Sequence, residues 1–482
     1  MKKPNILLLM CDQFRGDTLS YKKHPDVQTP HLDTLAAQGV SFQHAYSSCP
    51  SCIPARVSLF TGKSQRNHGR VGYEDGISWN FEHMFPQLLS DHGYQSKCVG
   101  KMHVHPIRKS CGFASITLHD GYLGYYRSTT IPHYQHQEVS DDYLYYLKKQ
   151  IGQSADVSAS GLDANSWVTH PWIYKEHLHP TNWAVDESIR FLNTRDREKP
   201  FFLMTSFVRP HPPFDAPQSY YDIYKNKQLQ DAASGNWKLQ NTLYGDTKDS
   251  IFGNHHPSMT HDAMAGYYAS ITHVDHQIGR LLTSLQEDGS YDNTIIIFLS
   301  DHGEMLFDHG LFRKVFPYEG STHIPLIFSI GKNVQAITPH ASKSIVELRD
   351  IMPTILDFAN ISTPSDVDGL SLYGEIADNK KIERSHLHGE HSFHSDLSNH
   401  FIVTNKDKYI WYSQTGTEQY FHLQNDPKET YNAIDDAAYK TRIQQLRNIL
   451  IDELKDCEEG YSDGTKLIVG KTPQNIVNSK KD

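Results

Sequence analysis

The sequence has no hydrophobic stretch long enough to cross a membrane. A transmembrane helix needs about 20 consecutive apolar residues, whereas the longest apolar run, Ile6 to Cys11, is only as long as a strand. The start, Met1-Lys2-Lys3, is basic, but Pro4-Asn5 and the short run that follows make a poor secretory signal. We therefore expect no membrane partner and a cytoplasmic location, or a periplasmic one if a leader has been removed.

An excess of positive charge is also missing. The 482 residues include 46 Lys and Arg against 56 Asp and Glu, which gives a formal net charge of −10. A protein that binds nucleic acid normally has a basic face, so we expect no nucleic-acid partner. An anionic substrate would have to be held by a local cluster of cations, because the overall field repels it.

Cysteine is scarce and scattered. Six cysteines in a chain of this length do not form the framework of a disulfide-rich protein, and they are compatible with a reducing compartment. They are Cys11, Cys49, Cys52, Cys98, Cys111 and Cys457.

Several short apolar runs predict strands that are buried on both faces, because they are continuously apolar rather than alternating. Helical patterns with terminal signals lie between some of them, which predicts a mainly parallel sheet wrapped by helices. Open sheets of this kind bind ligands where their strands end. The predicted strands are Pro4 to Met10, Gln95 to Val99, Pro200 to Phe207, Asn293 to Leu299 and Ile324 to Ile330, and the predicted helices are Thr29 to Gly39 and Phe85 to His92.

Two parts of the chain depart from this pattern. Residues 119–179 and 217–261 show no clear periodicity, so we interpret them as long surface insertions that carry specificity. After about Ser385 the strands become short and are separated by turns. We predict a catalytic α/β domain over residues 1–385 and a C-terminal subdomain over residues 386–482. This subdomain would contain a small antiparallel sheet (His400 to Thr404, Lys408 to Tyr412, Tyr420 to Leu423) and a helix, Ala438 to Leu454.

The most informative segment starts at Cys52 and reads CIPARVSLFTG. Pro54 suits the first turn of a helix, whose N-terminal amides favour a negative group. Arg56, one turn further on, can neutralise an oxyanion. Other interpretations are a redox or zinc-binding CxxC formed with Cys49, or a buried inert thiol. The CxPxRxxxxTG pattern resembles the signature of type I sulfatases, which belong to the alkaline phosphatase superfamily. The resemblance implies that a maturation enzyme oxidises Cys52 to formylglycine, and that the fold is alkaline-phosphatase-like.

The resemblance also implies a metal site. Asp12 and Gln13 end the first predicted strand, and Asp301 and His302 follow a later one, where the family has its metal ligands. With the modified Cys52 they would bind a divalent cation, most often Ca²⁺ in this family. Gln13 and His302 leave Mg²⁺ and Mn²⁺ open. The alternative for the Asp301 pair is a helix N-cap after a strand.

Four more residues match family elements in chain order. Lys101 and His103 resemble the GKxH element, in which the lysine binds sulfate and the histidine contacts formylglycine. His211 resembles the histidine that faces the scissile oxygen, and Lys314 resembles the second sulfate-binding lysine. A single His or Lys at any such place is more often an ordinary surface residue. Their order along the chain favours the functional interpretation.

The implied reaction is hydrolysis of a sulfate monoester. The metal, Arg56, Lys101 and Lys314 would form a positive cradle, one hydroxyl of the formylglycine hydrate would attack sulfur, and His211 would protonate the departing alcohol. His103 would then take the proton that allows sulfate to leave and restores the aldehyde. An ordinary Cys or Ser lacks the second hydroxyl that this reset needs.

Two other functions stay open. Phosphonate or phosphate monoester hydrolases of the same superfamily share much of this pattern, but are expected to lack the lysine and histidine of Lys101-Met102-His103. An inactive homologue that only binds sulfated ligands is the second, although every expected catalytic position is occupied. For the substrate we expect a sulfated carbohydrate, such as a glycosaminoglycan fragment, held by aromatic residues between Tyr122 and His179. A simple aryl or choline sulfate is the alternative.

Overall fold

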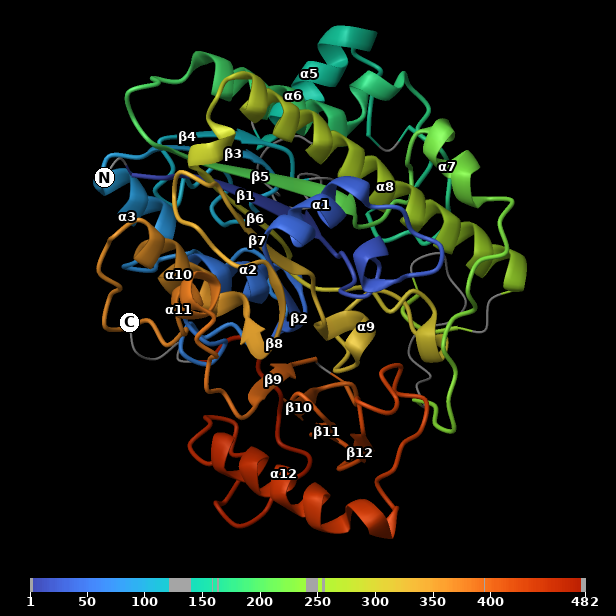
Figure 1. The fold of residues 1–482 in the computed structure, drawn as a ribbon. Coiled ribbons are helices and arrows are strands. Elements are labelled where there is room, and N and C mark those ends of the chain that lie inside the picture. The colour runs from blue at the N-terminus through green and yellow to red at the C-terminus, as the bar shows by residue number, and fades with distance from the viewer. Residues whose placement is uncertain are drawn as a thin grey trace.

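The computed structural model describes residues 3–477 except 121–139, 158, 163, 240–249, 254–255 and 394. Within these residues a large sheet is covered by helices on both faces, and a smaller sheet packs below it (Figure 1). The strands of the large sheet are β1 (Asn5–Asp12), β2 (Val40–Tyr46), β3 (Gln95–Gly100), β4 (Ser115–Leu118), β5 (Phe201–Pro210), β6 (Thr294–Ser300), β7 (Leu326–Ile330) and β8 (His340–Glu347).

Most helices lie above or below the large sheet, and α12 packs on the smaller one (Figure 1). They are α1 (Pro30–Gln38), α2 (Cys52–Thr61), α3 (Phe85–Asp91), α5 (Asp142–Ile151), α6 (Pro180–Thr194), α7 (Gln218–Tyr224), α8 (Pro257–Glu287), α9 (Glu319–Thr322), α10 (Ile351–Phe358), α11 (Tyr373–Asp378) and α12 (Lys440–Glu453). Short 3₁₀ turns span Ser20–Lys22, Glu176–Leu178, Tyr291–Asn293, Asp308–Gly310, Leu348–Asp350 and Ala437–Tyr439.

The large sheet is mixed but mainly parallel, as the sequence predicts. Its described strands run in the order β4-β3-β5-β1-β6-β7-β2-β8. The central strand β1 pairs in parallel with β5 and β6, whereas β7 is antiparallel to both of its neighbours. The carboxyl ends of β1, β3, β5 and β6 therefore meet at one edge, where parallel sheets place their sites.

Side chains that alternate along β1 divide the core into two layers. Leu7 and Leu9 pack with α1, α5, α6 and α8 on one face. Leu8 and Met10 pack with α2, α3 and α10 on the other. Because both faces are buried, the strand is apolar at almost every position.

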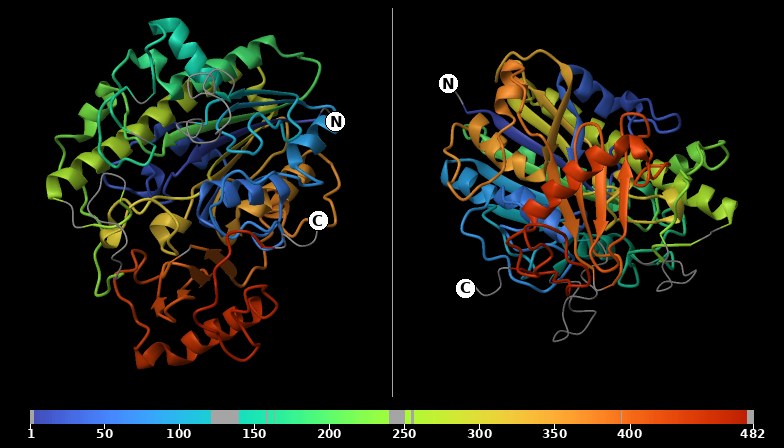
Figure 2. Two further views of the ribbon diagram at one scale, coloured as in Figure 1. Left: turned by 180° about the vertical axis from the view of Figure 1, so that it is seen from behind. Right: turned by 90° about the horizontal axis from the view of Figure 1, so that it is seen from below.

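The smaller sheet is antiparallel, in the order β12-β11-β10-β9, and α12 covers one of its faces (Figure 2). Its strands are β9 (Leu387–His391), β10 (Asn399–Val403), β11 (Lys408–Tyr412) and β12 (Glu418–Phe421). The sheet and helix agree with the predicted C-terminal architecture. The opposite face shares an apolar cluster with residues of the large domain such as Tyr46 and Tyr318.

The predicted surface insertions contain more structure than their composition indicates. The first holds α5, and Trp167 and Trp172 from the same stretch are buried in the upper core. These two tryptophans pack against Phe307 and His179 and do not line the cavity described below, so they are not available to stack on a sugar ring there. For the other aromatic residues between Tyr122 and His179 the expectation stays a prediction. The second holds α7 and the start of α8. Residues 121–139 and 240–249 of the insertions lie outside the described residues.

Helix α1 differs from the prediction in how it is capped. Thr29 occupies the N-cap position but its side chain makes no capping bond; it donates to Asp33 Oδ1 (3.1 Å) and accepts from the Ser20 amide. The first free amides of α1 are bound instead by Asp275 of α8, whose carboxylate accepts from Leu32 N at 2.8 Å. Among the described helices, none combines the length and the apolarity that crossing a bilayer demands.

Candidate active site

Two neighbouring strands deliver acidic residues to the same point. β1 ends at Asp12, and β6 ends just before Asp301 and His302. All three side chains are fully buried, and His302 Nε2 lies 3.5 Å from Asp12 and 3.7 Å from Asp301. The described residues directly after Asp301, 302–307, form no helix, so Asp301 and His302 are not an N-cap.

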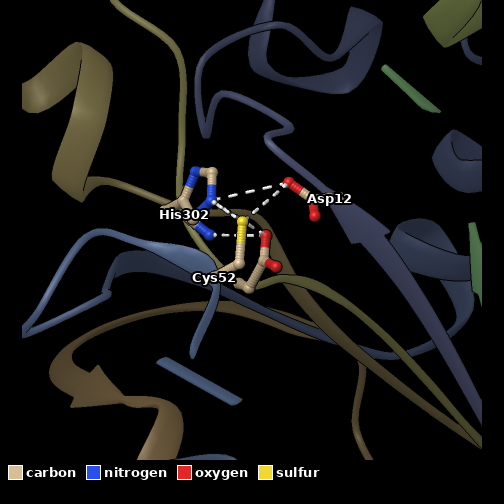
Figure 3. A group of neighbouring side chains, drawn as sticks. Asp12, Cys52 and His302 are labelled. Atoms are coloured by element: carbon tan, nitrogen blue, oxygen red, sulfur yellow. Dashed lines mark hydrogen bonds and ion pairs between the residues drawn. The ribbon is translucent and has the colours of Figure 1, made fainter. Parts of the chain in front are cut away.

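Cys52 is the first residue of α2 and points at this group (Figure 3). Its Sγ lies 3.3 Å from His302 Nε2 and 3.7 Å from Asp12 Oδ1. Burial and the Asp12 carboxylate act to raise the pKa of this thiol, but the surrounding cations outweigh them and lower it below its usual value. Cys49 and Cys52 are both free thiols.

Arg56, one turn further along α2, is fully buried and ties the acidic residues together. Its Nε donates to Asp301 Oδ2 at 3.0 Å, and a terminal nitrogen lies 3.6 Å from Asp12 Oδ2. A second terminal nitrogen donates to the Lys101 carbonyl at 2.9 Å. Burial would lower the pKa of Arg56, but the two carboxylates hold it above its usual value. The guanidinium is therefore a fixed positive charge beneath the site.

Lys101 and His103 follow β3 directly. Gly100 makes this possible, because its φ is +97° and a Cβ there would lie 2.0 Å from the Ser206 carbonyl oxygen. The Lys101 Nζ donates to Asp12 and lies 3.9 Å from Cys52 Sγ. Burial acts to lower the pKa of Lys101, but the negative groups beside it have the larger effect and raise the pKa above its usual value. The ammonium therefore stays charged.

His103 and His211 are both buried beside the nucleophile position. Asp120 fixes the turn of His103 by accepting from its backbone amide at 3.0 Å. His211 follows β5, and its Nδ1 donates to the Pro212 carbonyl at 2.7 Å. Burial, helped by Lys314, holds the pKa of His211 well below its usual range. A bound anion would oppose that effect, since it favours the protonated imidazole.

Lys314 is the second lysine beside Cys52. Its Nζ lies 3.2 Å from Cys52 Sγ and donates to Gln13 Oε1 at 2.8 Å. The amide nitrogen of Gln13 donates to Glu304, a fully buried carboxyl that also accepts from the Arg313 amide. Glu304 therefore orients both Gln13 and the loop that carries Lys314. The sequence analysis missed this residue, although it stands three residues after Asp301.

These side chains form the floor of one cavity of about 260 Å³. Its walls include residues that the sequence analysis did not predict. They are Ser51, Tyr73, Ala164, Asn165, Ile251, Arg313, Val315 and Phe393. Asn165 and Ile251 come from the two predicted insertions, so both insertions reach the site. Tyr73 and Phe393 come from loops with no distinctive signal.

The structure brings all of the predicted site residues together. Five line the cavity directly: Cys52, Lys101, His103, His211 and Lys314. The other five, Asp12, Gln13, Arg56, Asp301 and His302, lie beneath its floor and are fully buried. A thiol at a helix N-terminus, flanked by two ammonium groups and two imidazoles, is suited to attack on an anionic ester.

Comparison with known protein families shows which family the chain belongs to. Residues 4–361 match the family described as Sulfatase. The chain belongs to the sulfatase family. It is a sulfuric ester hydrolase with an alkaline-phosphatase-like fold. Residues 307–456 of this sulfatase also match the family described as N-sulphoglucosamine sulphohydrolase, C-terminal.

Curated relatives agree over nearly the full length. An arylsulfatase of Clostridium perfringens is 50% identical over 471 residues, covering 97% of this sulfatase and 98% of the relative. An N-acetylglucosamine-6-O-sulfatase of Bacteroides thetaiotaomicron is 25% identical, covering 99% and 91%.

Solved structures support the same fold. A structure in complex with its substrate D-glucosamine-2-N,6-O-disulfate matches with a TM-score of 0.75 and 23% identity, covering 94% of this sulfatase and 98% of that chain. The phosphonate monoester hydrolase of Agrobacterium radiobacter matches with a TM-score of 0.75 and 24% identity, covering 93% and 95%. At these identities the likeness shows the fold and does not separate sulfate from phosphonate chemistry.

Sulfatases generally use a divalent metal, and the residues of this site fit one. One ligand atom each of Asp12, Cys52, Asp301 and His302 lies within 4.8 Å of all the others. His302 Nδ1 donates to the Gly303 carbonyl at 3.0 Å, which leaves the lone pair on Nε2, the nitrogen that faces the two carboxylates. Oxygen ligands suit a hard cation, and the imidazole widens the choice.

Proposed function

We propose that this sulfatase hydrolyses a sulfate ester on a small carbohydrate, with residue 52 converted to formylglycine and with Ca²⁺ held by Asp12, Gln13, Asp301 and His302. The observation that carries the proposal is the position of Cys52, between Lys101 Nζ at 3.9 Å and Lys314 Nζ at 3.2 Å on the cavity floor. Two cations beside a nucleophile can each bind an oxygen of the sulfate group.

The formylglycine hydrate supplies two hydroxyls, one to attack sulfur and one whose deprotonation later releases sulfate. His211 donates a proton to the departing alcohol. Because its Nδ1 hydrogen is held by the Pro212 carbonyl, the proton must come from Nε2. His103 takes the proton in the release step, and Arg56 holds Asp301 and Asp12 in place.

When bound, the cation would neutralise charge on the sulfate and favour the ionised hydroxyl of residue 52. Mg²⁺ and Mn²⁺ are the alternatives to Ca²⁺. The test is chelation of the purified enzyme followed by addition of single cations. Full recovery of activity with Ca²⁺ supports the proposal, and unchanged activity after complete metal removal contradicts it.

Conversion of Cys52 requires a maturation enzyme as a partner. The side chain is only 2% exposed in the folded chain, so a separate enzyme cannot reach it after folding. We infer that the enzyme acts on the segment around Cys52 before α2 packs against the sheet. Refolded chain that has never met this enzyme should then be inactive.

A sugar ring is the substrate body that the cavity walls favour. Tyr73 and Phe393 offer flat apolar surface for one face of a ring, and Asn165 and Arg313 bring polar groups for hydroxyls. A volume of about 260 Å³ suits one ring beyond the sulfate rather than the interior of a polymer. The relative from Bacteroides thetaiotaomicron is named as an N-acetylglucosamine-6-O-sulfatase, and the solved complex holds a sulfated glucosamine as its substrate.

The second candidate is a simple aryl sulfate. It is favoured by the apolar residues of the wall and by the 50% identical relative, which is named an arylsulfatase. A panel of defined sulfated monosaccharides, a nitrophenyl sulfate and the matching phosphonate ester would separate the possibilities. We expect the highest kcat/KM on a sulfated monosaccharide. Preference for the aryl sulfate supports the second candidate, and preference for the phosphonate contradicts both.

A further inference from the structure

A second cluster of potential metal ligands lies on the small sheet, outside the active-site cavity. His388 and Glu390 are two residues apart on β9 and therefore point to the same face. His400 on β10 is paired directly with Glu390, which places its side chain on that face as well. This is the face that α12 covers, at the lower end of the molecule (Figures 1 and 2).

The three side chains converge on one point. One ligand atom of each lies within 4.8 Å of the other two, and His400 Nδ1 lies 3.5 Å from Glu390 Oε2. The two imidazole rings are nearly parallel, with an interplanar angle of 14° and centroids 5.7 Å apart. Ligand atoms around a tetrahedral zinc ion are about 3.3 Å apart, given bonds near 2.0 Å. Small side-chain rotations would close the difference.

Three polar atoms of the cluster have no hydrogen-bond partner among the described residues. They are His388 Nε2, His400 Nδ1 and Glu390 Oε1, and each is shielded from solvent. The side chains are only 7%, 3% and 2% exposed. A buried polar atom without a partner typically costs about 1–3 kcal/mol. Three such atoms in one cluster of potential ligands indicate a ligand that satisfies them together.

The charges around the cluster also favour a cation. Arg66 forms ion pairs with both Glu390 and Glu459, at 2.5 and 3.0 Å, so two carboxylates share one guanidinium. Glu453, at the end of α12, lies 4.0 Å from His388 Nδ1. Arg66 engages Glu390 through Oε2, the oxygen that lies 3.5 Å from His400 Nδ1, and Oε1 has no hydrogen-bond partner among the described residues. A buried excess of negative charge is unfavourable unless it is balanced.

We propose that His388, Glu390 and His400 bind a structural Zn²⁺, with water as the fourth ligand. Two imidazoles and a carboxylate are a typical zinc donor set, whereas Ca²⁺ and Mg²⁺ prefer oxygen ligands throughout. The ion takes no part in sulfate hydrolysis, and the inference does not depend on the proposed substrate.

The site would stabilise the strand that supports the nucleophile segment. The Glu390 amide donates to the Ser48 carbonyl at 2.8 Å, and the neighbouring His391 Nε2 lies 2.9 Å from the hydroxyl of Ser51, the N-cap of α2. Arg66 comes from the segment that follows α2. Zinc would therefore fix β9 against both ends of the catalytic helix.

The test counts Zn²⁺ ions on the full-length chain. Purified protein is stripped of metal, saturated with Ca²⁺ and titrated with Zn²⁺, and bound zinc is counted by native mass spectrometry. His388→Gln, which alters the least buried ligand, and Glu390→Gln should each bind one Zn²⁺ fewer than the wild type or bind it at least about tenfold more weakly. His386→Gln is the matched control, because His386 lies on the same segment outside the cluster, and it should bind zinc like the wild type.

A second set of measurements separates this site from the catalytic one. His302→Ala should lose any zinc bound at the active site and keep the proposed ion. Co²⁺ bound in place of zinc should give the visible spectrum of a tetrahedral site in wild type and His302→Ala, but not in His388→Gln. The proposal is overturned if the wild type binds no zinc beyond the ion that His302→Ala removes. That count needs no variant of the small sheet to fold.

Discussion

At the scale of single residues, buried charge compensation organises the active site. Asp12 is contacted by Lys101, Arg56 and His302, so each cation is held where a sulfate group can use it. Motif spacing could predict these residues, because binding a metal and a sulfate group requires acidic and basic side chains at those positions. Tyr73 and Phe393 could not be predicted, because an aromatic residue in a loop carries no sign of which cavity it faces.

Lys314→Ala tests the cradle at this scale. The substitution removes the cation 3.2 Å from Cys52 Sγ, and loss of one preorganised charge should lower kcat by about 10²–10³-fold. Steady-state kinetics on an aryl sulfate measure it. Lys332→Ala is the control, because the Lys332 side chain is 75% exposed and forms an ion pair with Asp292 at the surface. A loss confined to KM would mean that Lys314 supplies uniform binding rather than catalysis.

At the scale of elements, burial on both faces made some strands easy to predict from the sequence and made one long helix hard to predict. β1, β5 and β6 are continuous apolar runs, and the predicted ends agree with the structure to within a few residues. Helix α8 was missed although it spans 31 residues. It packs against β5 and also against α1, α6 and α7, so small and polar residues interrupt any single apolar stripe.

Gly100→Ala tests how β3 positions Lys101 and His103. The new Cβ would meet the Ser206 carbonyl oxygen at 2.0 Å with φ at +97°, so we expect a loss of stability above about 2 kcal/mol and at least tenfold lower activity. Gly93→Ala has a similar φ of +89° with nothing within 4 Å, and should cost about 1 kcal/mol without affecting kcat. Equal activity in the two variants would show that the close approach at Gly100 is unimportant.

Asp275 makes the capping of α1 dependent on pH. Burial raises its pKa from 3.8 to about 7 against the opposing backbone hydrogen bonds. Its contribution to stability is therefore fully present below about pH 4 and is lost as the pH rises through 7. Relative to the wild type, Asp275→Asn should gain about 2–3 kcal/mol of stability between pH 5 and pH 8, because part of the change has already occurred below pH 5. Urea unfolding at both pH values measures this, and a pH-independent difference would contradict it.

At the scale of the whole molecule, the end of the described chain returns to the active-site rim. Val71 N donates to the Asn475 carbonyl, Val477 N donates to the Gly69 carbonyl, and Asn475 Nδ2 donates to the Tyr73 carbonyl at 3.2 Å. The C-terminal part of the chain thus holds the loop that carries Tyr73. Sequence reasoning could place a C-terminal subdomain, but pairing between residues 400 positions apart leaves no local pattern. Its predicted boundary at residue 385 stays a prediction.

Truncation after Lys471 tests this contact. Without residues 472–477 the Tyr73 loop loses the segment that binds it, so KM for a sulfated saccharide should rise about tenfold while kcat on a small aryl sulfate changes little. Truncation after Val477 is the control and should leave both constants unchanged. Equal KM values for the two truncated forms would rule out a role for the returning segment in substrate binding.

The most direct test of the account is to measure the chemical state of residue 52 in active enzyme. Peptide mass spectrometry, with hydrazide capture of aldehydes, gives the fraction of chains in which Cys52 has become formylglycine. Across preparations made with and without the maturation enzyme, sulfatase activity should rise in proportion to that fraction, and Cys52→Ala should be inactive while folding normally. Full activity in a preparation whose residue 52 is entirely unmodified cysteine would contradict the account.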